Sequence, residues 1–407
     1  MMHTQSHPAA SAHSAHSALG LGAVALFVAG ANLRPAIAAV SPLADHIRSD
    51  LHLSATGLSL LTTLPTLAMG VCAPAAAIVA RRLGLHRGVL LGLAIITLAT
   101  AARAAGASSW LQLSCSAAAG AGIAIAQTLL PAVVKARFAD RLGLVTGIYT
   151  AGLGLGGAVA AGVSAPLADA VGSWPGALGS WAVLALAGSV LWSVTGRALG
   201  PDGVATPSGP VTRGLPWRSA KAWRITTLAA GNSALYYCEL AWVAALLQDD
   251  GGHSAAGAGL LLTVMISLQV VSMLAVPALL GEGRSTRQDL VWTTTLTAVG
   301  FLGLAFAPGT ATWLWIVALG IGHGSLFTLV LTLPVVSSRD SAEAGRISAM
   351  AFFVGYSCAA LAPVLVGALR DSTGDFHLAF GLLGGLAVLM LLPTARIRGD
   401  NGAKAQR

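Results

Sequence analysis

The chain has 407 residues, of which 55% are hydrophobic and only 9% are charged, and its formal net charge is +8. Soluble domains carry about 25% charged residues, so this composition argues against a soluble enzyme, a disordered protein or a nucleic-acid-binding protein. The excess positive charge is expected in loops, where it reports membrane orientation and not affinity for DNA.

The apolar residues fall in twelve blocks of about 20 residues, the length at which a helix crosses the hydrocarbon core. Backbone N–H and C=O groups must be satisfied within the lipid, so each block is expected to be helical. The sequence therefore predicts an all-α membrane protein with twelve transmembrane helices, over 18–44, 54–80, 88–106, 109–134, 143–168, 174–196, 223–247, 255–280, 288–307, 311–336, 344–369 and 375–393.

Lysine and arginine positions predict the orientation of these spans. If both termini are cytoplasmic, nineteen of the 23 lie in inner loops or the C-terminal tail. The outer loops then hold only Arg48, Arg103 and Arg370, while Arg34 lies inside the first span. This asymmetry predicts a multi-pass protein of the inner membrane with both termini inside.

The spans divide into two related halves. Gly143, Asp169 and Gly172 recur as Gly345, Asp371 and Gly374, 202 positions later each time. Two pseudo-symmetric six-helix bundles are therefore expected, and such bundles can rock about a site at their interface. The predicted organisation is an N-terminal bundle over 18–196, a cytoplasmic linker rich in Pro, Gly and Arg over 197–222, a C-terminal bundle over 223–393 and a cytoplasmic tail over 394–407.

The N-terminal segment 1–17 is rich in Ser, Ala and His. We expect a disordered, solvated tail, with metal binding by its histidines as the alternative. The four cysteines are scattered singly through apolar segments, so neither a disulfide framework nor a metal site is indicated. No cofactor is expected.

Arg34 is the strongest single indication of function. It lies about 15 residues into the first span, where a guanidinium costs at least ~2.5–3.5 kcal/mol on insertion scales. We expect it to bind substrate in a polar cavity between the bundles, with Asn32 beside it; a structural arginine locked to a neighbouring helix is the alternative. Pro35 removes a helix N–H and predicts a kink at this point.

Glu239 is the only acidic residue placed within a predicted span. Asn232, Tyr236 and Glu239 are spaced i, i+4 and i+7, so they form one polar stripe on the seventh span. The repeat places Arg34 near position 237. Glu239 is thus expected either to couple transport to protons or to neutralise Arg34 in the empty carrier.

Four other residues are candidates for the substrate site. His323 lies between two glycines in the tenth span, where a ligand or a neighbouring helix can approach it closely. It is expected either to bind substrate or take up a proton, or to be an ordinary hydrogen-bonded histidine within the membrane. Gln127 and Tyr149 are candidate cavity donors, with hydrogen bonding between helices as the alternative. Trp242 is either a stacking wall for a flat ligand or a packing residue.

The basic turn between the second and third spans is a candidate gate. Arg81, Arg82 and Arg87 could contact helix C-termini of the other bundle, or they could be positive-inside charge alone. Two other patterns have structural explanations. The glycine run 152–157 lies inside a span and indicates close helix packing, and the cluster Asp45, His46, Asp50 and His52 fits a short outer loop.

Several stretches resemble one known family. They are ANLRPAIAAVSPLADHIRSDLHLS from Ala31, ARRLGLHRGVLLGL from Ala80, AQTLLPAVVKARFADRLGLVTGIYTAGLGLG from Ala126 and AMAFFVGYSCAALAPVLVGALRDSTGDF from Ala349. The chain resembles the cyanate and 2-nitroimidazole transporters of the major facilitator superfamily over nearly all of its spans. It departs from that family at His323, where the family has a glutamine nearby, and at Glu239, which the family pattern lacks.

The resemblance implies a secondary transporter for a small anion or a small polar heterocycle. We expect a small anion to move by alternating access, by facilitated diffusion or linked to protons, in a monomer surrounded by lipid. Export of a neutral nitroimidazole-like heterocycle is the alternative. The spans lack paired aspartates, a Ser/His dyad and an HExxH segment, so an intramembrane enzyme is not expected.

Overall fold

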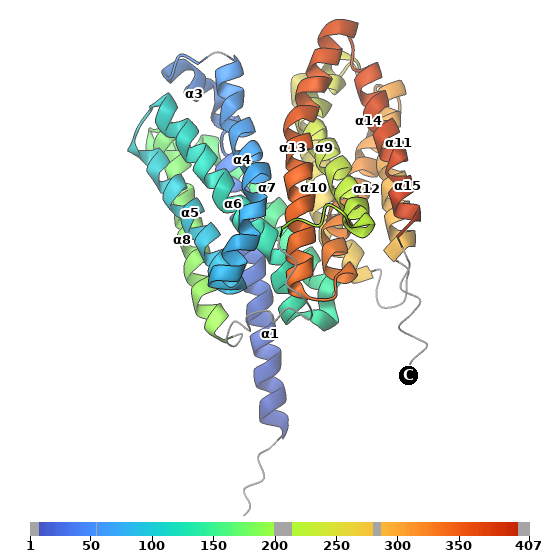
Figure 1. Ribbon diagram of the computed structural model, residues 1–407. Coiled ribbons are helices and arrows are strands. Elements are labelled where there is room, and N and C mark those ends of the chain that lie inside the picture. Colours follow the sequence, from blue (N-terminus) through green and yellow to red (C-terminus); the bar gives the residue numbers. More distant parts are fainter. Residues whose placement is uncertain (1–7, 54, 199–213, 280–285, 398–407) are drawn as a thin grey trace, which may run out of the picture.

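The computed structural model describes residues 8–53, 55–198, 214–279 and 286–397, and all regular secondary structure in these ranges is helical (Figure 1). The first half contains α1 (Pro8–Ala31), α2 (Pro35–Ala38), α3 (Ala44–Asp50), α4 (Ala55–Leu83), α5 (Leu85–Ala102), α6 (Ser109–Arg137), α7 (Leu142–Val171) and α8 (Trp174–Ala198). The second half contains α9 (Ala220–Asp249), α10 (Ala255–Leu279), α11 (Thr286–Phe306), α12 (Thr312–Ser337), α13 (Ser341–Thr373), α14 (His377–Leu389) and α15 (Leu391–Ala395).

Within the described ranges, 11 helical segments are long and apolar enough to cross a membrane. The remaining predicted span corresponds to α9, which has 30 residues and is therefore long enough to cross. Its polar residues, Asn232 and Glu239 among them, lower its hydropathy. The twelve predicted blocks thus match twelve helical segments, and the fold is the expected all-α arrangement of two six-helix bundles.

The N-terminal end of the described chain differs from the prediction. Helix α1 begins at Pro8, so residues 8–17 of the predicted disordered tail are helical. Residues 1–7 lie outside the described residues, as do 199–213 of the predicted linker and 398–407 of the predicted C-terminal tail. A helix that starts earlier than the apolar block is possible because Ser, Ala and His tolerate a helix once the apolar part anchors it.

The first span is interrupted where the sequence predicts a kink. Helix α1 ends at Ala31, and α2 begins at Pro35 with Arg34 in the N-cap position. Proline fits the first turn of a helix because its missing N–H has no partner there. The span therefore breaks into two helices, and residues 32–34 form a short non-helical connection at the depth of Arg34.

The repeat appears in the ends of equivalent helices. Gly172 follows α7 with φ of 67° and Gly374 follows α13 with φ of 85°, and each lies at the C-cap of its helix. Both positions have left-handed backbone conformations that favour glycine. The recurring glycines therefore mark corresponding turns of two related bundles.

The bundles meet along α4, α6 and α7 on one side and α10, α12 and α13 on the other. In Figure 1 they diverge toward the end of the molecule that carries α3. Close approaches include Gly70 against Ser357 and Gly345 against Ala132. One buried apolar cluster of the first bundle continues into the second through Met273, Phe327 and Phe352, so the two bundles share part of their packed core.

Candidate functional site

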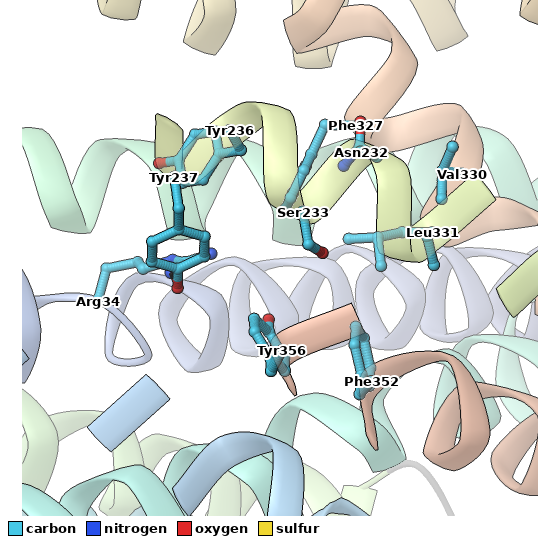
Figure 2. A pocket seen from close by; sticks show the side chains of 11 residues that line it. Arg34, Asn232, Ser233, Tyr236, Tyr237, Phe327, Val330, Leu331, Phe352 and Tyr356 are labelled. Atoms are coloured by element: carbon cyan, nitrogen blue, oxygen red, sulfur yellow. Dashed lines mark hydrogen bonds between the residues drawn. The ribbon is translucent and has the colours of Figure 1, made fainter. Parts of the chain in front are cut away.

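A pocket lies where the bundles meet, around Arg34 (Figure 2). All its other lining residues come from the second bundle: five from α9, three from α12 and two from α13. They are Ala229, Asn232, Ser233, Tyr236, Tyr237, Phe327, Val330, Leu331, Phe352 and Tyr356. The pocket thus combines one cation of the first bundle with a largely aromatic wall of the second.

Arg34 is only 6% exposed and is held by aromatic side chains. Its Nη1 donates to the Tyr237 hydroxyl at 2.7 Å, and its guanidinium carbon lies 5.4 Å from the Tyr236 ring and 5.7 Å from the Tyr237 ring. Figure 2 shows Arg34 beside Tyr237, with Tyr356 and Phe352 across the pocket. Cation–π contacts of this kind stabilise a desolvated guanidinium without neutralising it.

No carboxylate of the described residues lies within ion-pair distance of Arg34. Its Nε atom is buried without a hydrogen-bond partner. A buried charge without a counter-charge is costly, because the attraction that would offset its lost hydration is missing. The pocket therefore holds a net positive charge and an unused donor.

Close helix packing fixes the position of Arg34. A Cβ added at Gly156 would lie 2.0 Å from the Ala31 carbonyl oxygen, and one at Gly152 would lie 2.3 Å from that of Phe27. Only glycine allows α7 to approach α1 this closely. The glycine run 152–157 thus allows close helix packing, as the sequence indicates. This packing fixes the end of α1, and Arg34 follows shortly after that end in the chain.

A second buried cation supports the broken span, and the sequence prediction placed it wrongly. Arg103 is 1% exposed, although it was expected in an outer loop. Its Nη1 donates to the carbonyl of Ala36 in α2 at 2.7 Å, and its Nη2 donates to Ser116 at 2.6 Å. Helix α2 is short, so its carbonyls need partners from elsewhere. Arg103 supplies a donor for one of these carbonyls, that of Ala36.

Glu239 contacts residues other than Arg34. It is 0% exposed; its Oε1 accepts from Gln269 Nε2 at 2.5 Å and lies 2.9 Å from His323 Nδ1. The expected neutralisation of Arg34 by Glu239 is therefore absent from this structure. Residues 237 and 239 lie about 200° apart around a helix, so Arg34, which reaches Tyr237, faces away from Glu239.

His323 belongs with Glu239 and does not line the pocket. Its Nε2 lies 3.2 Å from the Asn232 carbonyl oxygen, and its ring centroid lies 6.1 Å from that of Tyr236. The flanking Gly322 and Gly324 admit α11 and α10 at short range. Of the predicted stripe, Glu239 and the Tyr236 ring therefore contact His323, whereas Asn232 contacts it only through its backbone carbonyl.

Gln127 and Tyr149 lie behind the pocket wall. Gln127 Nε2 donates to the Tyr356 hydroxyl at 2.5 Å, across the bundle interface, while its Oε1 has no partner. Tyr149 is 0% exposed, and its hydroxyl is buried without a partner. Neither residue lines the cavity, but Gln127 fixes a residue that does.

Asn32 and Trp242 lie away from the pocket. Asn32 Nδ2 donates to the Val28 carbonyl at 2.8 Å, on the side of α1 that packs against Gly188. Trp242 Nε1 donates to the Pro363 carbonyl at 2.9 Å, and its ring packs against Phe376. In this structure both residues have packing contacts. For Trp242 this corresponds to the packing role that the sequence analysis gave as the alternative to stacking on a ligand.

The basic turn is exposed and forms no hydrogen bond or ion pair with the other bundle through its three arginines within the described residues. Arg81, Arg82 and Arg87 have exposed side chains, and none makes a hydrogen bond or ion pair with the residues that the structure describes. The turn is tied to its own bundle, because the His86 ring stacks on Trp192 at 5.6 Å. A cross-bundle contact of these arginines is therefore not formed in this conformation.

Metal binding has no support in the described part of the chain, where no group of three or more His, Cys, Asp or Glu could hold an ion. In the outer cluster, Asp50 instead accepts from Trp174 Nε1 at 2.9 Å, and the Asp45 side chain lies outside the described residues. The four tail histidines lie outside the range for which side chains are described.

The sequence analysis did not identify Tyr237, Gln269, Tyr356 or Arg103 as site residues. Tyr237 was detectable, because the repeat aligns it with Arg34, 203 residues away. Gln269 and Arg103 carried no signal, since a lone glutamine in a span and an arginine next to a loop are common.

The Major Facilitator Superfamily model matches residues 19–363 of the chain. The chain is 33% identical over 360 residues to the 2-nitroimidazole transporter of Escherichia coli, covering 88% of this chain and 90% of that protein. It is 30% identical over 351 residues to the cyanate transport protein CynX of E. coli, covering 86% and 90%. It is 32% identical over 367 residues to the uncharacterized transporter YycB of Bacillus subtilis, covering 89% of each.

Solved structures show the same fold at low identity. The human organic anion transporter MFSD10 superposes with a TM-score of 0.75 at 13% identity, covering 91% of this chain and 98% of that one. The proton:xylose symporter XylE superposes with a TM-score of 0.76 at 12% identity, covering 94% and 96%.

Proposed function

Because the chain belongs to the major facilitator superfamily and is a transporter of the type that its relatives represent, we propose that it carries a small monovalent anion, bound at Arg34. The single observation that carries this proposal is a buried guanidinium with no carboxylate in contact and an unused Nε donor. An anion in the pocket would supply the missing counter-charge and accept from Nε.

The aromatic wall favours a small, flat ligand. Tyr236, Tyr237, Phe327, Phe352 and Tyr356 surround the guanidinium, and rings of this kind pack against planar groups. Cyanate, a planar carboxylate and a nitroheterocycle are all small, flat groups of the kind that such rings can contact. Relatives named for cyanate and for 2-nitroimidazole support the same size class.

Transport would proceed by alternating access, with the two bundles rocking about the pocket. Arg34 belongs to the first bundle and the rest of the lining to the second, so rocking would open the pocket to either side in turn. The positive-inside pattern supports an inner-membrane protein with both termini cytoplasmic. We further propose a monomer and a link to protons through Glu239, which cannot work by direct competition for Arg34 in the conformation described above.

Flux measurements in proteoliposomes separate this proposal from its alternative, a neutral nitroimidazole-like cargo. We expect cyanate and benzoate to be taken up or to compete with each other, and we expect Arg34→Ala to abolish both effects. The neutral alternative is supported by the aromatic wall. It predicts 2-nitroimidazole flux that survives Arg34→Ala and is not inhibited by either anion, a result that would overturn the anion proposal.

A further inference from the structure

A second buried ionisable group lies beside the Arg34 pocket. Glu239 of α9 and His323 of α12 are 0% and 1% exposed, and Oε1 and Nδ1 lie 2.9 Å apart. Among the residues that the structure describes, the contacts of the pair come from the second bundle, whereas Arg34 belongs to the first. The protein therefore separates its fixed cation from its acidic group, one on each bundle.

The contacts of the imidazole determine how many protons the pair holds. Nε2 lies 3.2 Å from the Asn232 carbonyl oxygen, which can only accept, so Nε2 carries a proton. If Nδ1 and Oε1 both lacked a proton, two acceptors would lie 2.9 Å apart in a site without exposure. One further proton on either atom would remove this repulsion.

With that proton the pair has no net charge, either as imidazolium and carboxylate or as imidazole and carboxylic acid. The contact between Nδ1 and Oε1 is close but not aligned as a hydrogen bond, and Glu239 Oε2 has no partner. Gln269 Nε2 donates to Oε1 at 2.5 Å, and this hydrogen bond would also stabilise Glu239 as a carboxylate. These contacts allow the proton to leave and return.

No other charged group of the described residues contacts the pair. On α9 the neighbouring ionisable groups are Tyr236 and Cys238, and α10 contributes the neutral Gln269. Helix α11 faces Gly322 with Leu296 and Thr297, which do not titrate. Tyr237, Tyr356 and Arg34 lie on the far side of Tyr236, in the pocket described above.

Tyr236 is the physical connection between the pair and Arg34. One ring contacts both groups, at 5.4 Å from the guanidinium carbon and 6.1 Å from the His323 ring centroid. The pair and the anion pocket are thus separate sites with one aromatic wall between them. A change of charge at one site therefore changes the electrostatic energy of the other, because little water lies between them to screen the interaction.

The charges of the two sites balance in only two of four loading states. With a monovalent anion on Arg34 and a proton on the pair, both sites are neutral; with neither, the positive Arg34 offsets the negative pair. Proton alone leaves one positive charge, and anion alone leaves one negative charge. Moving an unbalanced charge through an occluded, water-poor centre is strongly disfavoured.

We propose that Glu239 and His323 form a single-proton site and that the carrier moves one proton together with one monovalent anion, with no net charge transferred. The coupling part rests on the proposed function, whereas the proton site does not.

The proton site is tested without any substrate. The purified full-length protein in detergent is titrated from about pH 5 to about pH 9, the range in which histidines and buried carboxyls change charge. Over some pH interval within this range, wild type should bind one proton more per molecule than Glu239→Gln. The His323→Gln substitution should shift that interval to a different pH. Identical curves for wild type and Glu239→Gln would overturn the site whatever the cargo is.

The coupling is tested by calorimetry of cyanate binding in buffers with different ionisation enthalpies. Wild type should take up one proton per cyanate bound at a pH where the pair is empty, and Glu239→Gln should take up none. Asp371→Asn, which removes an exposed carboxyl, is the matched control and should behave as wild type. Cyanate binding to wild type without proton uptake at any pH would overturn the coupling.

Flux gives the stoichiometry. In proteoliposomes, cyanate uptake should follow an imposed pH gradient and should not change when potassium and valinomycin set a membrane potential. Uptake that responds to the potential would overturn the one-to-one ratio. Failure of wild type to bind or move any anion would instead overturn the proposed function, and the substrate-free titration would still decide the proton site.

Discussion

The guanidinium of Arg34 donates to the hydroxyl of Tyr237 at 2.7 Å, although the two residues are 203 positions apart and belong to different bundles. This separation is within one residue of the 202-residue repeat, so the contact joins equivalent positions of the two halves. In a two-bundle carrier such positions lie near the pseudo-symmetry axis, where a substrate site is expected.

Tyr237→Phe should weaken anion binding about tenfold. The change leaves one guanidinium N–H unpaired and removes the bond that aims Arg34 into the pocket, which costs about 1–2 kcal/mol. Tyr236→Phe is the matched control, because Tyr236 contacts Arg34 through its ring and no hydrogen bond of its hydroxyl is found within the described residues. Cyanate affinity measured by calorimetry checks this pair, and equal losses in both variants would show that the Tyr237 hydroxyl has no special role.

Gly156→Ala should destabilise the protein by about 1–3 kcal/mol, because the new Cβ would lie 2.0 Å from the Ala31 carbonyl oxygen and would push α1 from α7. Gly162→Ala on the same helix meets nothing within 4 Å and should be neutral or stabilising by a few tenths to ~1 kcal/mol. Thermal unfolding in detergent measures both. If the two variants unfold at the same temperature, the close packing of α1 and α7 described here is wrong.

Arg103→Met should lower both stability and anion affinity, because the Ala36 carbonyl and Ser116 lose their buried donor at a cost of about 1–3 kcal/mol. Arg103→Lys should recover part of both, since it keeps a charged donor. The exposed Arg87 provides the control as Arg87→Met. If Arg103→Met binds anions with wild-type affinity, the hydrogen bonds of Arg103 are not needed to position Arg34.

Ala132→Cys combined with Gly345→Cys should form a disulfide that stops transport. A Cβ at Gly345 would lie 3.7 Å from that of Ala132, which is within the range of disulfide geometry, and the two residues lie on opposite bundles. Rocking must separate them, so oxidation should abolish flux and reduction should restore it. Either single variant, each tested under the same oxidation, is the control; full flux through the oxidised double variant would contradict rocking of the two bundles at this contact.

The sequence was sufficient for the architecture because membrane helices are determined locally, by length and hydropathy, and the repeat reveals their grouping. It also predicted that Arg34 faces a cavity between the bundles, because an arginine deep in an apolar block has few alternatives. It did not determine which face of each helix points where. The expected Arg34–Glu239 contact failed on this point, since depth follows from position along the chain, whereas the side-chain direction changes by about 100° per residue.

Arg103 illustrates the complementary limit. It lies in the last residues of the predicted span 88–106, next to an outer loop, where an arginine is common and nothing local distinguishes it. Its burial results from the break at residues 32–34, which brings the α2 carbonyls against the end of α5. A residue whose role depends on a distant irregularity can be found only once that irregularity has been placed in three dimensions.

The most direct test of the central claim is the affinity for cyanate and benzoate of the purified wild-type protein, compared with Arg34→Gln and with Arg48→Gln, which removes an exposed arginine. Loss of a buried charge pair costs about 2–5 kcal/mol, so Arg34→Gln should weaken anion binding at least about thirtyfold while Arg48→Gln binds as wild type. Anion affinity in Arg34→Gln equal to that of wild type would contradict the account, because the anion would then be bound without the cation that defines the site.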